Sequence, residues 1–113
     1  MDTTQTIVEK LVAIFGDDPQ TLKDISRLFL EQCDTLLADM RKAIDTQNVE
    51  KLSMAAHTFK GSALSFGLET LSKQAQSLET MGKTKNMSKA RNALKSLIGS
   101  VEEIKPLLIK LCA

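Results

Sequence analysis

Apolar residues recur at intervals of three and four along almost the whole chain, which is the spacing of amphipathic helices rather than of strands. The pattern divides where helix-ending and helix-starting residues occur. It predicts five helical segments, at about residues 4–15, 17–46, 49–67 and 69–81 and from about residue 87 onward. The chain is therefore expected to be all-α.

The breaks between these segments have a physical basis. Gly16, Gly67 and Gly82 are expected to end their helices, because glycine readily adopts the left-handed conformation that closes a last turn. In the segment 17–19, Asp can cap a helix and Pro suits its first position. Pro106 should kink or interrupt the last helix, because proline lacks a backbone donor and clashes with the preceding turn.

Short connections between helices of this length favour antiparallel neighbours. The predicted architecture is an up-down-up-down four-helix bundle with the short N-terminal helix packed across one end. With 113 residues the chain offers material for one core, so residues 1–113 are expected to form a single domain. Such a bundle is a common scaffold, and the fold alone does not reveal an activity.

Composition narrows the possible partners and the compartment. The net charge is +1 and the four aromatic residues are all Phe, which argues against nucleic acid as a partner. Cys33 and Cys112 form neither a disulfide framework nor a metal-ligand spacing, so reduced thiols are expected. No signal peptide and no membrane-spanning stretch is present. The sequence predicts a soluble cytoplasmic protein that does not bind membranes.

Most catalytic motifs are missing. The chain has no glycine loop for phosphates, no HExxH, no GxSxG and no CxxC, which argues against ATP-dependent, metal-hydrolytic and serine-hydrolase chemistry. The single histidine, His57, is the remaining candidate nucleophile.

His57 is predicted to point away from the bundle core. On a helical wheel, the apolar and small residues of its segment cluster on the opposite side. They are Leu52, Ala55, Phe59, Ser62, Ala63 and Phe66. This placement disfavours a buried structural histidine. The remaining alternative to a reactive group is an idle surface histidine.

Lys60 and Gly61 lie about 60° and about 40° from His57 on the same exposed face. Glycine inside a helix costs about 1 kcal/mol relative to alanine, so Gly61 suggests that a partner approaches closely there. Like-charge repulsion from Lys60 would favour the neutral, nucleophilic ring, and its ammonium could neutralise an attached phosphate. The alternative for Lys60 is an ordinary solvated lysine.

Ser53, Met54 and Leu64 border His57 and suggest a docking surface with an apolar rim. Alternatively, Met54 and Leu64 pack beneath the first helix.

The segment HTFKGSALSFG resembles the signature of the histidine phosphotransfer (HPt) domain, with His57, Lys60, Gly61 and Gly67 at the matching positions. FLEQCDTLLADMRKAI is similar to the second helix of that family, in which a polar residue often supports the phosphorylated ring. Gln32 is the matching candidate for this supporting role. The alternative is that Gln32 is a boundary residue beside the core. Lys83 matches a basic residue that some relatives carry near the site.

The resemblance implies a phosphorelay intermediate. His57 would accept a phosphoryl group from a receiver-domain aspartate through Nε2, with Lys60 neutralising charge, and pass it to another receiver aspartate. Its partners would be response-regulator receivers, a hybrid sensor histidine kinase, or both. The chain would be a monomeric, stoichiometric carrier without an ATP site or a cofactor of its own, and Mg²⁺ is expected in the partner receiver. Met1 favours a free-standing protein over an excised domain.

Two other readings compete with this one. The chain could be an interaction or scaffold bundle that is never phosphorylated. Alternatively, it could bind nucleic acid through a run of cations without an intervening acidic residue, comprising Lys83, Lys85, Lys89, Arg91 and Lys95. The same run could steer an acidic receiver or simply solvate the helix.

Overall fold

The computed structural model describes the backbone of residues 3–112 and the side chains of residues 7–110. Five α-helices account for most of this range and no strand occurs in it, which confirms the all-α class. In chain order they are α1 (Thr3–Phe15), α2 (Pro19–Asp45), α3 (Val49–Ser65), α4 (Glu69–Lys83) and α5 (Ala90–Cys112).

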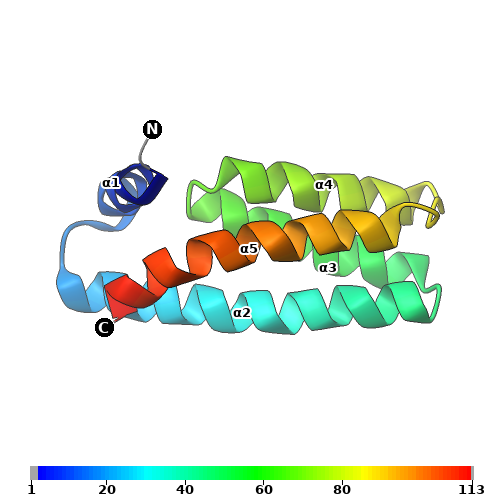
Figure 1. Ribbon diagram of the computed structural model, residues 1–113, viewed down its shortest axis with the longest axis horizontal. Helices are drawn as coiled ribbons and strands as arrows, with labels where there is room; N and C mark the ends of the chain where they lie inside the picture. The colour runs from blue at the N-terminus through cyan, green and yellow to red at the C-terminus, as the bar shows by residue number, and fades with distance from the viewer. Residues whose placement is uncertain (1–2, 113) are drawn as a thin grey trace.

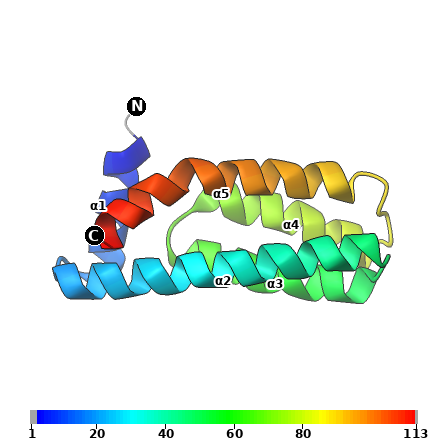
Figure 2. The same ribbon diagram turned by 60° about the horizontal axis from the view of Figure 1, so that its bottom comes forward.

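Helices α2 to α5 lie lengthwise beside one another and form a helical bundle (Figures 1 and 2). Helix α3 packs against α2 and α4, and α5 packs against the same two neighbours. Helix α1 lies across the end of the bundle where α2 begins, and it contacts α2. Helix α3 therefore has one side on the bundle and one side open to solvent.

Local signals in the sequence position most helix ends. Gly16 and Gly67 adopt φ values of +88° and +70°, which confirms left-handed ends for α1 and α3. The Asp18 side chain accepts a hydrogen bond of 3.0 Å from the backbone N–H of Thr21, so it caps α2 ahead of Pro19.

The predicted end of α4 at Gly82 and the predicted interruption of α5 at Pro106 are wrong. Helix α4 continues through Gly82 to Lys83, because Gly82 is buried against α3 and serves close packing rather than a turn. Helix α5 runs through Pro106 without interruption. The carbonyl that Pro106 leaves without an intrahelical donor belongs to Glu102, on the exposed side of the helix, where water can reach it.

The core is formed by buried apolar residues from all five helices, whereas Ile14, which was expected on the buried stripe of α1, is half exposed. Cys33 lies in this core, and burial raises the pKa of its thiol to about 12, so the thiol stays protonated and unreactive. The Cys112 side chain lies outside the described residues. None of the described helices combines the length and the apolar character needed to cross a bilayer.

Candidate functional site

His57 lies near the middle of α3 on its open side. Its side chain is 68% exposed, which confirms the predicted orientation away from the core. The opposite side of α3 is buried as predicted, through Leu52, Ala55, Phe59, Ala63 and Phe66. Ser62, which the wheel placed at the edge of this group, is only half-buried. His57 is thus carried by a helix whose other face is fixed in the core.

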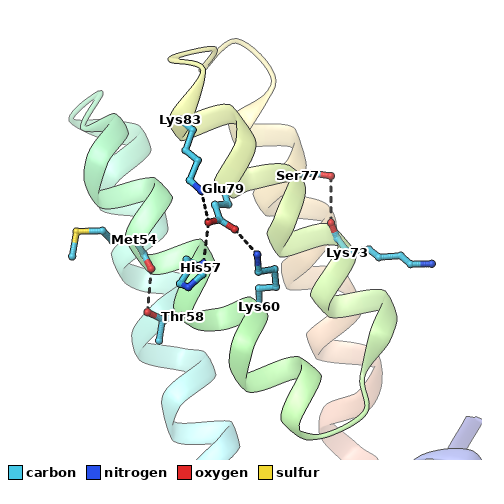
Figure 3. A network of polar contacts seen from close by, with 8 residues as sticks. All are labelled: Met54, His57, Thr58, Lys60, Lys73, Ser77, Glu79 and Lys83. Carbon is cyan, nitrogen blue, oxygen red and sulfur yellow. Dashed lines mark hydrogen bonds and ion pairs between the residues drawn. The ribbon is translucent and has the colours of Figure 1, made fainter.

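The His57 ring contacts a glutamate that the sequence analysis did not single out. Glu79 of α4 places Oε2 2.9 Å from Nδ1 of His57, and the Glu79 side chain is only 6% exposed (Figure 3). One signal for this residue was present in the sequence. Glu79 is four residues after Ala75 and three before Gly82, so it is a charged residue on the face that α4 buries.

Two lysines share the same carboxylate. Lys60 of α3 contacts Oε1 at 2.9 Å, and Lys83 of α4 contacts Oε2 at 3.1 Å (Figure 3). The hydrogen bond from Lys60, followed by those from Lys83 and His57, lowers the pKa of Glu79 from its ordinary 4.5 to about 2, against burial, which raises it. Glu79 is therefore an anion at neutral pH.

This charge state determines which ring nitrogen is free. An ionised carboxylate only accepts hydrogen bonds, so the proton in the contact with Glu79 belongs to Nδ1 of His57. In the neutral ring the lone pair then resides on Nε2. The geometry supports Nε2 as the nucleophile, the atom that the sequence analysis named.

Gly82 explains how Glu79 comes so near to His57. A Cβ atom at Gly82 would lie 2.7 Å from the carbonyl oxygen of Val49 and 2.9 Å from the backbone nitrogen of Ser53. The glycine thus lets the α4 backbone approach α3 one turn away from the contact between His57 and Glu79. Ser53, a predicted binding residue, is half-buried in this seam between α3 and α4 rather than on the open face.

The open face of α3 carries the predicted rim. Met54 and Leu64 are 70% and 56% exposed, so the alternative that they pack beneath the first helix is wrong. A Cβ atom at Gly61 would meet no atom within 4 Å. Gly61 therefore has no packing role within the described molecule, which agrees with access for a partner.

Two other predicted residues lie apart from the ring. Gln32 of α2 accepts a hydrogen bond of 2.8 Å from the Ser62 hydroxyl, and none of the hydrogen bonds described joins it to His57. Gly67 ends α3 with a positive φ, and its carbonyl accepts a hydrogen bond of 3.0 Å from the Lys10 ammonium. The structure thus gives Gly67 a conformational role. It also places Lys83 on Glu79, beside the ring.

Comparison with known proteins agrees with this geometry. Residues 24–106 match the family model described as the Hpt domain. Because the match covers more than half of the sequence, the chain belongs to the Hpt domain family. No solved structure matches the chain with significance.

Three fungal proteins are similar to the chain. "Multistep phosphorelay regulator 1" of Schizosaccharomyces pombe is 30% identical over 78 residues, which are 68% of this chain and 26% of that protein. The "Phosphorelay intermediate protein YPD1" of Candida albicans is 28% identical over 67% of this chain and 41% of its own length. The protein of the same name in Saccharomyces cerevisiae is 26% identical over 69% and 47%, respectively. The aligned region spans less than half of each relative.

Proposed function

We propose that this chain is a phosphorelay intermediate, in which His57 accepts a phosphoryl group from a receiver-domain aspartate and passes it to another receiver aspartate. The observation that carries the proposal is the exposed imidazole whose Nδ1 is bound to an ionised Glu79. Membership of the Hpt family and the phosphorelay names of the relatives support it.

The transfer step needs little from this chain besides a positioned nucleophile. The Nε2 lone pair forms a bond to phosphorus while the bond from phosphorus to the aspartyl oxygen breaks, and the carboxylate leaves with that electron pair. Phosphoryl transfer depends on in-line positioning and charge neutralisation, and Mg²⁺ in the receiver would supply much of the latter. The chain is then a stoichiometric carrier that needs no ATP site of its own.

Lysines and a glycine complete the proposed site. Lys60 and Lys83 bring two ammonium groups close to the ring, where they can offset the charge of the transferred group. Gly61 leaves the approach to the face of α3 open.

The partner surface that we propose is the open face of α3. Met54 and Leu64 flank His57 along the helix as exposed apolar side chains, and Gly61 leaves space between them. Exposed apolar groups around a reactive centre suit a partner that seats a helix or loop against them. Response-regulator receivers or the receiver of a hybrid sensor kinase are the proposed partners.

The proposed scaffold is an up-down-up-down arrangement of α2 to α5 that acts as a monomer. The short connections between consecutive helices support this topology. A cytoplasmic setting, where thiols remain reduced, suits the free thiol of Cys33.

The proposal is tested by phosphoryl labelling. Incubation with phosphorylated receiver domains of the source organism should label the wild-type chain with an acid-labile, base-stable phosphate, and His57→Gln should remain unlabelled. Labelling of the variant at the wild-type level would refute the assignment. A wild-type chain that no activated donor labels would instead support a scaffold bundle that acts without phosphorylation.

A further inference from the structure

Phosphorylation at Nε2 changes the charge of the His57 ring, and the Glu79 carboxylate lies beside that ring. A ring that gains a phosphoryl group at Nε2 and keeps its proton on Nδ1 carries a positive charge. The Glu79 carboxylate lies 2.9 Å from Nδ1 and is almost fully buried. An anion at this distance in a poorly solvated position stabilises a cation far more than it would in water.

We propose that Glu79 keeps the phosphorylated His57 ring protonated on Nδ1 and thereby makes the ring a better leaving group for onward transfer. This inference rests on the function proposed above and adds a residue that controls it. Glu79 acts through His57 and does not touch the phosphoryl group, so it is a positioning residue.

The proton on Nδ1 determines the charge of the group that leaves during onward transfer. A carboxylate oxygen of the accepting aspartate forms a bond to phosphorus, the bond between phosphorus and Nε2 breaks, and its electron pair returns to Nε2. With a proton on Nδ1, the departing group is a neutral imidazole that still donates to Glu79, and no proton has to move. Without that proton, the departing group is an imidazolate anion unless it takes a proton from solvent. The carboxylate therefore removes a proton-transfer requirement from the step.

The charged groups around the ring are consistent with this role. Lys60 from α3 and Lys83 from α4 also face it, and both ammonium groups would oppose a positive ring if they stood alone. Both contact Glu79 instead, Lys60 through Oε1 and Lys83 through the same Oε2 that binds the ring. The added phosphoryl group is itself negative and offsets part of their charge.

The two lysines differ in exposure, and we assign them different roles. Lys60 is 23% exposed and bridges α3 to α4, so it holds the carboxylate in place. Lys83 is largely exposed, and its interaction with Glu79 is screened by water. When the phosphoryl group arrives, Lys83 can move to it without leaving Glu79 unpaired, because Lys60 and the Nδ1 proton remain.

Glu79→Gln tests the inference, because glutamine keeps the length and an acceptor oxygen but removes the charge. Wild type and variant are phosphorylated with a phosphoramidate salt, which requires no partner protein, and freed of reagent. Loss of the phosphoryl group to water and to a receiver domain is then followed between pH 5 and pH 9. We expect the variant to lose the group about tenfold more slowly at pH 8. The two rates should converge toward pH 5, where solvent protonates both rings.

Nitrogen-15 NMR of the phosphorylated ring gives a direct readout. The proton on Nδ1 should be observed at pH 8 in the wild type and should be absent in Glu79→Gln. Glu79→Asp, which keeps the charge on a shorter side chain, should retain the wild-type shape of the pH profile. It also provides a second test if the glutamine variant folds poorly.

The outcomes separate this inference from the proposed function. If phosphoramidate does not label His57 in the wild type, the function itself fails. If both proteins are labelled and their rates follow parallel pH profiles, the inference is wrong and Glu79 has only a structural role.

Discussion

The two sides of α3 differ most clearly at two helical glycines. Gly61, on α3 itself, lies on the open face, where an added Cβ would meet no atom within 4 Å. Gly82 comes from α4 and lies in the seam, where an added Cβ would stand 2.7 Å from the carbonyl oxygen of Val49. Glycine therefore allows close packing of two helices at position 82 and leaves an open space at position 61.

His57 lies between these two regions. Its Nδ1 belongs to the seam, where Glu79 fixes the ring, and its Nε2 is left to the open face. The contact that orients the ring and the space through which a partner would approach therefore lie on opposite sides of one helix. A long side chain on the open face should therefore act mainly by blocking a partner, whereas changes in the seam should act on the packing of α3 against α4 or on the charge beside the ring.

The largest expected effect is on the open face. Gly61→Arg should reduce transfer from a phosphorylated receiver by about 100-fold, because a long side chain would hold the partner away from Nε2. Stability should not fall, since the site is open and arginine favours a helix more than glycine does. Gly99→Arg is the matched control, because Gly99 is also an exposed helical glycine with open surroundings, on α5. Equal transfer rates in the two variants would show that partners do not approach over Gly61.

A smaller effect is expected in the seam. Gly82→Ala should lower the free energy of unfolding by about 1–3 kcal/mol, because the atoms that the new methyl group meets are mainly backbone and cannot swing aside. Gly61→Ala should raise it by about 0.5–1 kcal/mol, since only helix propensity changes there. Urea denaturation measures both. The two substitutions should change the free energy of unfolding in opposite directions. A Gly82→Ala variant that is more stable than the wild type would contradict the close approach of α4.

A third effect concerns acid stability. The pKa of Glu79 is 4.5 ordinarily and about 2 in the fold, so its stabilising contribution is complete above pH 4.5 and is lost as the pH falls toward 2. Removing the charge in Glu79→Gln should lower the stability at neutral pH by about 2 kcal/mol, allowing for screening around Lys83. This deficit should shrink as the pH falls. Glu102→Gln, at an exposed position, should show no such convergence in denaturation measured between pH 2 and pH 7.

The helices and the exposure of His57 could be predicted because they depend on local signals. Spacing of apolar residues places four of the five helix starts within about two residues, and caps such as Asp18 act within one turn. The side of α3 that carries His57 follows from the positions of Leu52, Phe59 and Ala63 alone.

Glu79 was missed because its role depends on a second helix. Sequence spacing within α3 brings Lys60 and Gly61 to His57, but it says nothing about which residue of α4 faces the ring. That partner is determined by how closely the two helices pack, and Gly82 looked like a helix end rather than a contact. For the same reason the sequence could not decide whether Gln32 of α2 supports the ring or is a boundary residue beside the core, and in the structure it binds Ser62.

A further consequence follows from the position of His57 and Glu79 in the middle of two packed helices. Both residues are held by helices, so within the described residues their contact does not depend on the conformation of a loop. If the chain is the carrier proposed above, the rate of transfer would depend on how often it meets its partners and on how many of them are phosphorylated. The direction of transfer would then follow from the amounts and the phosphorylation of the partner proteins.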